Sequence, residues 1–369
     1  MPASPTRPPL LATLALLLGA CAPTGTDTVT PPTTATTPGP PAFHAQTQLF
    51  KQADPSVIRV GGTYYSVQSD GNQTIRVRAA SSVDGLASAT PTTVYAHPTS
   101  TNEVWAPELI HDGSTYYIYF TMGAGDSHRM YVMQSSSPTG GYSAPAKLNL
   151  PDDKWAIDGT LFTYNAQRYF VWSGWVGDRN GEQTLFLSRM SSPTTVASGE
   201  TRHVISQPRE SWEQADPNPP TRVNEGPEAI KDPSGQLHIV YSANGSWDSN
   251  YCLADLRLRA GGDPTYVWDW YKSNGCLFGS KSNLMMSGWD PTLSVNGPGH
   301  HSFVLLDGDI NTSPPSGQKF PLMYHAVSKS LPYTWANRFW YSGSFMWWGN
   351  MTYTRGGASN TGWSLKFFE

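Results

Sequence analysis

Five short motifs in this chain place a polar or small residue at one repeated position, ahead of an apolar run and a turn. The residues at that position are Asp54, Ala106, Asp158, Glu225 and His300, in ADPSVIRVGG, WAPELIHDG, IDGTLFTYN, NEGPEAIKD and GHHSFVLLD. In each motif the turn residue follows seven positions later, as Gly61, Gly113, Asn165, Asp232 and Asp307. Two carboxyl groups that face one pocket, one protonated and one ionised, can hydrolyse a glycosidic bond. A third carboxyl group near the proton donor can raise the pKa of that donor.

Each acid taken alone has a simpler interpretation, because Asp and Asn before Pro or Gly are ordinary turn formers. Three acids at the same position of different repeats are harder to assign to turns. Like charges that are crowded together repel one another and lose hydration, so a purely structural protein would gain little from them. We therefore treat Asp54, Asp158 and Glu225 as candidate catalytic residues.

The spacing of the motifs indicates the fold. The five positions stand 52, 52, 67 and 75 residues apart, and 34 Gly and 31 Pro separate short runs rich in Val, Ile, Tyr, Phe and Trp. Helical periodicity is scarce, so the pattern predicts an all-β protein. Repeats of this length are typical of β-propeller blades of about four strands. We predict a five-bladed β-propeller in a single domain over residues 43–369, with one strand of each blade lining a central channel.

The first 42 residues indicate export rather than part of the fold. Residues 1–20 carry one early cation and the apolar run from Leu10 to Leu18, which is too short for a permanent membrane span. The tetrapeptide Leu18–Cys21 resembles a bacterial lipobox and predicts lipidation of Cys21; the alternative is an ordinary secretory signal. Residues 21–42 are rich in Thr and Pro and indicate an extended tether. We expect a protein that is lipid-anchored to the cell envelope or secreted, with membrane contact only through the lipid.

Cysteine count and composition restrict the remaining function classes. Of the three cysteines, Cys252 and Cys276 can form a disulfide in an oxidising compartment, which leaves Cys21 for the lipid. The net charge is −4 and no basic run is present, so we expect no nucleic-acid partner. The 14 Trp, 18 Tyr and 13 Phe, with only 14% charged residues, suit a sugar-binding protein, although a β-protein without a ligand can share that composition. We expect a monomer.

The motifs ADPSV, WAPEL, IDGTLF, NEGPEAI and GPGHHSF, in this order, resemble glycoside hydrolase family 43. The resemblance runs from about Ala53 to Ala326 and implies the five-bladed propeller. It implies a general base at Asp54, a pKa modulator at Asp158 and a general acid at Glu225. It also implies hydrolysis with inversion, for which the working pair of carboxyl groups stands about 6.5–9.5 Å apart.

The resemblance further implies a calcium ion in the central channel, largely water-coordinated, beside a histidine that matches His300. Calcium prefers oxygen ligands, so water should supply most of its shell. The alternatives are that His301 is the relevant ring, or that His300 is hydrogen-bonded to a carboxylate without a metal. Two further acids lie near the repeated positions: we interpret Glu108 as structural and leave Glu228 unassigned.

The substrate follows from a closer resemblance. WAPEL, the paired cysteines and the YHA at 324–326 are most similar to exo-acting α-L-arabinofuranosidases that trim α-1,5-arabinan. A β-xylosidase or an arabinofuranosidase acting on arabinoxylan is the alternative within the class, and a non-catalytic carbohydrate-binding propeller is the alternative outside it. Trp105, Trp172 and Trp175 are candidate sugar contacts, although buried Trp is commonly part of a core. The aromatic-rich RFWYSGSFMWWGNMTYTRGG departs from the family pattern, and we expect it to close the last blade or to extend the substrate surface.

Overall fold

The structure is a computed structural model that describes residues 47–99, 103–215 and 222–369, all within one compact unit. The predicted export signal, the lipidation site at Cys21 and the tether lie outside the described residues. No helix in the described ranges has the length and hydropathy of a membrane span.

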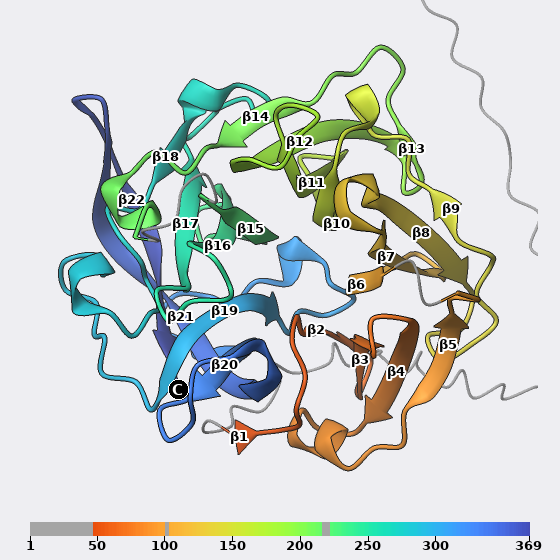
Figure 1. Cartoon of the computed structure of the whole chain (residues 1–369). Coiled ribbons are helices and arrows are strands. Elements are labelled where there is room, and N and C mark those ends of the chain that lie inside the picture. The colour runs from red at the N-terminus through yellow and green to blue at the C-terminus, as the bar shows by residue number, and fades with distance from the viewer. Residues whose placement is uncertain (1–46, 100–102, 216–221) are drawn as a thin grey trace, which may run out of the picture. The chain divides into compact units, whose positions relative to one another are not determined.

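Five antiparallel sheets follow one another along the chain and surround a common centre (Figure 1), which confirms the five-bladed β-propeller. Blade 1 contains β2 (Ser56–Val60), β3 (Thr63–Asp70), β4 (Thr74–Ala80) and β5 (Thr92–Ala96). Blade 2 contains β6 (Glu103–Asp112), β7 (Thr115–Gly123), β8 (Arg129–Ser135) and β9 (Ala146–Lys147). Blade 3 contains β10 (Ala156–Tyr164), β11 (Gln167–Trp175), β12 (Gln183–Ser192), β13 (Thr195–Val196) and β14 (His203–Ser206).

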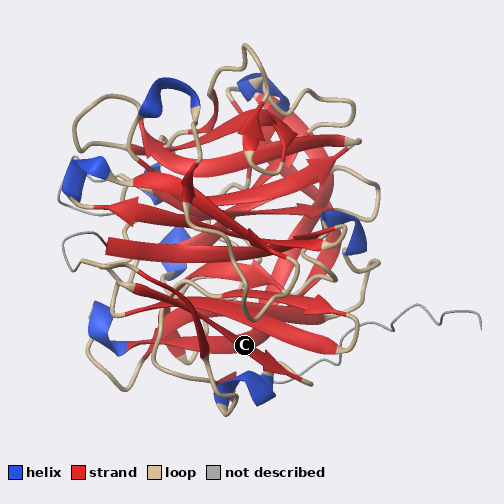
Figure 2. Ribbon diagram, turned by 90° about the vertical axis from the view of Figure 1, so that its right-hand side faces the viewer, coloured by secondary structure: helices blue, strands red, loops and turns tan. Residues whose placement is uncertain are grey.

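The last two blades differ in how they are completed. Blade 4 contains β15 (Asn224–Lys231), β16 (Leu237–Ala243), β17 (Cys252–Leu258) and β18 (Trp270–Lys272). Blade 5 contains β19 (Val295–Phe303), β20 (Phe320–Ser328), β21 (Arg338–Arg355), β22 (Ala358–Phe368) and the early strand β1 (Thr47–Gln48). The described helices are single 3₁₀ turns in the connections (Figure 2): η1 (Asp84–Ala87), η2 (Gly125–Ser127), η3 (Pro151–Asp153), η4 (Ser211–Glu213), η5 (Val267–Asp269), η6 (Ser282–Leu284), η7 (Ile310–Thr312) and η8 (Trp335–Asn337).

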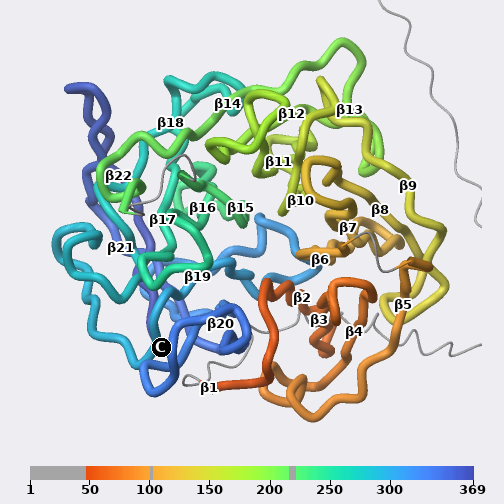
Figure 3. Tube along the Cα trace, viewed as in Figure 1, coloured from red at the N-terminus to blue at the C-terminus, as the bar shows by residue number. Residues whose placement is uncertain are grey.

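Strand β1 closes the ring, because it pairs with β21 of the last blade through Thr47 and Ser342 (Figure 3). The aromatic-rich C-terminal segment forms β21 and pairs with β22, so it completes the last blade, one of the two outcomes expected for it. Apolar clusters fill the spaces between neighbouring blades: one joins Ile58 and Val67 of blade 1 to Leu109 and Ile118 of blade 2. This packing holds the inner strands β2, β6, β10, β15 and β19 around the channel.

The expected disulfide joins Cys252 to Cys276 across 24 residues of blade 4. Closing a loop of that length should contribute about 3 kcal/mol to the free energy of unfolding. We predict that the Cys252→Ala/Cys276→Ala variant loses roughly that amount in urea unfolding. Both cysteines are buried, so the two substitutions can destabilise the protein by changing the packing as well. Oxidised and reduced wild-type protein should therefore be compared, because these two forms differ only in the disulfide. An identical unfolding midpoint for those two forms would contradict the prediction.

Candidate active site

The three predicted acids lie in one cavity of about 550 Å³ at one end of the channel. Asp54 precedes β2 of blade 1, Asp158 lies in β10 of blade 3, and Glu225 lies in β15 of blade 4. Residues 67 or more positions apart in sequence therefore share one site. The cavity is also lined by Trp105, Trp155, Ile157, Trp247, His300, Trp335 and Arg338.

A bulge in the inner strands places these side chains, and it corrects one detail of the repeat. Asp54, Ala106, Asp158 and His300 share a left-handed backbone with φ of 54°, 40°, 54° and 40°, but in blade 4 that conformation belongs to Gly226, with φ of 53°. Glu225 therefore stands one position earlier, at the register of Trp105 and Ile157. The prediction of one shared register was wrong for Glu225, because the turn between β15 and β16 is longer than the two-residue turns of blades 1 and 3.

Asp54 is held between two histidine rings. Its Oδ1 atom lies 3.2 Å from Nδ1 of His300 and 3.2 Å from Nδ1 of His325, and its backbone N–H lies 3.1 Å from the same nitrogen of His325. Burial acts to raise the pKa of this carboxyl group, but the charge of His300 and the hydrogen bond to His325 outweigh it and hold the pKa well below its usual range. Asp54 is therefore ionised at neutral pH, as a general base must be.

Glu225 has the opposite environment. Its side chain is 7% exposed, and burial together with the charge of Asp158 raises its pKa to about 8, although the Tyr251 hydroxyl donates to its Oε1 atom at 2.9 Å. Glu225 is therefore protonated at neutral pH and can donate a proton. Its pKa and that of Asp54 are pushed apart, which separates an acid from a base.

Asp158 lies between these two extremes. Burial raises its pKa to about 6 in spite of the nearby His300, and its Oδ2 atom accepts a hydrogen bond of 3.0 Å from the backbone N–H of Gly226. The left-handed conformation of Gly226 aims this N–H at the carboxylate. Since the charge of Asp158 raises the pKa of Glu225, the structure gives Asp158 a physical means of modulating the acid.

His300 lies among three carboxyl groups. Nδ1 is 3.2 Å from Asp54 and 3.8 Å from Asp158, and Nε2 is 3.8 Å from Glu108. Burial lowers its pKa, but these acids raise it to about 10, so the ring is a cation without a free lone pair. Within the described residues no group of three or more His, Cys, Asp or Glu side chains is arranged to hold a metal. The carboxyl oxygens of Asp54, Asp158 and Glu108 are of the type that calcium prefers, and water would have to supply the rest of its shell. The alternative ring, His301, is fully buried and does not line the cavity.

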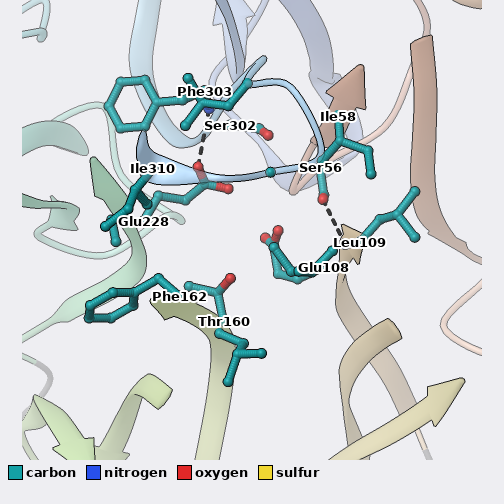
Figure 4. A pocket seen from close by; sticks show the side chains of 15 residues that line it. Ser56, Ile58, Glu108, Leu109, Thr160, Phe162, Glu228, Ser302, Phe303 and Ile310 are labelled. Atoms are coloured by element: carbon teal, nitrogen blue, oxygen red, sulfur yellow. Dashed lines mark hydrogen bonds between the residues drawn. The ribbon is translucent and has the colours of Figure 1, made fainter. Parts of the chain in front are cut away.

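Glu108, interpreted as structural, and the unassigned Glu228 line a second, smaller chamber in the channel (Figure 4). Its polar lining consists of residues two positions after each bulge position: Ser56, Glu108, Thr160, Glu228 and Ser302. The Ser56 hydroxyl accepts from the N–H of Leu109 at 3.0 Å, and Glu228 accepts from the N–H of Phe303 at 3.1 Å. These bonds join neighbouring blades, and the second gives Glu228 a structural partner. With a volume of about 20 Å³, the chamber has room for about one water molecule.

The predicted tryptophans separate into three environments. Trp105 lines the cavity and stacks on His128 with ring centroids 4.0 Å apart. Trp175 lies behind the wall and stacks on Trp155, at 4.5 Å, which itself lines the cavity. Trp172 lies in the hydrophobic core with Phe170 and Phe186, outside the cavity lining, so its ring has no face for a sugar. Trp172 is therefore part of the core and not a substrate contact.

Sequence comparison gives the family. Residues 49–339 match Glycosyl hydrolases family 43. The chain belongs to this family. Among curated proteins, it is 29% identical over 328 residues to the extracellular exo-α-(1→5)-L-arabinofuranosidase of Streptomyces avermitilis and 28% identical over 323 residues to the enzyme of that name from Streptomyces chartreusis. These alignments cover 86% and 84% of this chain, and 61% and 90% of the respective relatives.

Solved structures agree with this family-43 assignment. The α-L-arabinofuranosidase from Lactobacillus brevis is similar with a TM-score of 0.67 and 25% identity, covering 83% of this chain and 94% of that protein. A xylan β-1,4-xylosidase from Bacillus halodurans, with a TM-score of 0.59 and 17% identity over 86% of this chain and 56% of that protein, shows the shared fold alone. The chain therefore has both the sequence and the fold of family 43.

Proposed function

We propose that this protein is an inverting, exo-acting α-L-arabinofuranosidase that releases arabinofuranose from α-1,5-arabinan or arabino-oligosaccharides. Asp54 is the base, Glu225 the acid and Asp158 the pKa modulator. The observation that carries the proposal is the arrangement of the two acids in one cavity: Asp54 lies beside His300 and His325, which favours its ionised form, while Glu225 is buried near Asp158, which raises its pKa to about 8. The two Streptomyces relatives are named for this linkage and this exo action, which supports the choice of substrate.

The reaction follows from the positions of the protons. Glu225 donates its proton to the glycosidic oxygen as the bond from that oxygen to the anomeric carbon breaks. Asp54 takes a proton from a water molecule, whose oxygen forms the new bond to the anomeric carbon on the opposite face. One water is consumed and each sugar leaves with a hydroxyl group, so atoms and charge balance. The contacts of Asp54 with His300 and His325 keep its carboxylate ionised before the water arrives.

One experiment distinguishes the alternative substrates and the alternative function. We propose testing debranched α-1,5-arabinan, arabinoxylan, xylo-oligosaccharides and aryl glycosides, with products separated by chain length. Release of single arabinose units from debranched arabinan supports the proposal. Preferential release of xylose, or of arabinose from arabinoxylan alone, would replace it with the alternatives within the class. Binding without any hydrolysis would favour a non-catalytic surface propeller instead.

The pH profile tests the role of Asp158. We predict that kcat/KM of the wild type falls above a pH of about 8, because Glu225 then loses its proton. In Asp158→Asn the neighbouring negative charge is absent, so the pKa of Glu225 should fall and the alkaline limb should move about one pH unit or more toward acid. The profile of kcat/KM from pH 4 to 10 measures both. An alkaline limb that stays in place in the variant would remove Asp158 from the modulator role.

The proposal also covers the export of the protein, its lipid anchor, its oligomeric state and a calcium ion. The Streptomyces relatives are named extracellular, which supports export of this protein to where plant cell-wall polysaccharide is found. The lipid anchor at Cys21 and the monomeric state stay predictions. The water-coordinated calcium ion also stays a prediction; it would have to replace a proton on His300, and no step of the reaction above depends on it.

A further inference from the structure

Two tryptophan side chains stand at the open end of the cavity, above the buried acids. Trp335 is 58% exposed and Trp247 is 38% exposed, whereas Glu225 in the same cavity is 7% exposed. Large apolar rings that are left in water beside a concave site commonly mark a binding surface. The two rings come from different connections, Trp247 from the one between β16 and β17, and Trp335 from η8 between β20 and β21.

The first connection also supports the proposed general acid. Glu225 pairs with Ser242 near the end of β16, and the chain then runs through residues 244–251 to β17. At the end of this connection, the Tyr251 hydroxyl donates to Oε1 of Glu225. Because a general acid must contact the leaving oxygen, the leaving part of the substrate lies on the Glu225 side of the cleaved bond. The connection that contacts the acid therefore also carries Trp247.

The second connection is fastened to the first. The Tyr333 hydroxyl donates to the carbonyl oxygen of Ser246 at 3.2 Å, next to Trp247 in sequence. The ring of Tyr333 lies over Gly297, where a Cβ atom would come within 2.3 Å of the hydroxyl oxygen. Trp335 follows two residues after Tyr333, so both exposed rings sit on segments joined by this hydrogen bond. Arg338, which also lines the cavity, lies 5.7 Å from the Trp335 ring centroid.

We propose that Trp247 and Trp335 bind the arabinose unit on the leaving side of the cleaved bond. This proposal rests on the proposed function. It adds a binding site for the sugar on the leaving side, and with it a preference for chains over small leaving groups. Flat aromatic faces pack against the C–H faces of a sugar, and a pair of rings offers a platform for one. Binding energy from this second sugar is used in the transition state. The enzyme should therefore prefer arabinan chains to arabinose carried on a small leaving group.

The test compares two substrates that differ in the leaving group. α-1,5-Arabinotriose has sugars on the leaving side, whereas α-L-arabinofuranosyl fluoride has a single atom there. We expect Trp247→Ala and Trp335→Ala to lose about tenfold or more in kcat/KM on the trisaccharide and less than about threefold on the fluoride. The matched control is Trp268→Ala, which removes another exposed ring, 61% exposed and outside the cavity lining, and should change neither value.

A second variant moves a ring without removing it. A Cβ atom at Gly245 would come within 2.2 Å of the Trp247 ring, so Gly245→Ala should displace the ring and give the same selective loss on the trisaccharide. Trp335→Phe keeps an aromatic face and should restore most of the loss. Equal losses on both substrates, or an unchanged rate on the trisaccharide in folded variants, would overturn the assignment of these rings. A wild-type protein that cleaves neither substrate would instead overturn the proposed function itself.

Discussion

Glu225→Gln should reduce kcat/KM on α-1,5-arabinotriose by about a thousandfold or more, because a positioned general acid contributes on the order of 10²–10⁴ and the sugar leaving group cannot depart unprotonated. Glutamine keeps the size of the side chain and can still accept from the Tyr251 hydroxyl. On α-L-arabinofuranosyl fluoride, whose leaving group needs less protonation, the loss should be at least tenfold smaller. Steady-state rates on the two substrates measure the difference.

The matched control for Glu225 is Glu200→Gln, the same change at a partly buried glutamate. Glu200 contacts His203 and Arg189 outside the cavity, so this variant should keep wild-type rates on both substrates. Equal losses of Glu225→Gln on the two substrates would contradict the role of proton donor. They would point to a role in binding or folding instead.

Asp54→Asn should reduce kcat/KM by about a thousandfold or more on both substrates. The attacking water must lose a proton whichever group departs, so a good leaving group should not rescue this variant. Asparagine keeps an oxygen that can accept from His300, and the backbone N–H of residue 54 still donates to His325, which should leave the fold intact. Rates on the two substrates, with circular dichroism as the check on folding, give the comparison.

The control for Asp54 is Asp153→Asn, an exposed acid paired with Arg129 and Lys147 outside the cavity. It should leave both rates unchanged. Rescue of Asp54→Asn by the fluoride leaving group would assign Asp54 to leaving-group departure rather than to water activation. The better leaving group should therefore rescue Glu225→Gln but not Asp54→Asn.

Much of this arrangement could be predicted from sequence because the blades repeat. The five motifs gave the number of blades, and Asp54, Asp158 and Glu225 were expected in one cavity, where the structure places them. The predicted register of Glu225 is wrong by one residue, because the left-handed position of blade 4 is Gly226, six rather than seven positions before Asp232. The turn of blade 4 is longer, so the distance from the turn does not give the register of Glu225. The pairing of Glu225 with β16 does.

Other parts of the cavity depend on contacts that sequence spacing does not show. Trp172 is predicted as a sugar contact because aromatic rings can stack on sugars, but its ring packs in the core. Trp155 was missed, although alternation along the strand places it on the face of Ile157, two residues later, and both line the cavity. Trp247 and Trp335 lie on connections whose course is set by tertiary contacts such as Tyr333 to Ser246, which no local pattern predicts.

The most direct test is a titration of the acid itself. In protein labelled with ¹³C at the glutamate carboxyl carbons, NMR should show one signal that titrates with a pKa of about 8 and disappears in Glu225→Gln. That result is expected if burial and Asp158 keep Glu225 protonated at neutral pH. A wild-type spectrum in which the signal lost in Glu225→Gln titrates near the ordinary glutamate value of about 4.3 would contradict the division of protons between Glu225 and Asp54.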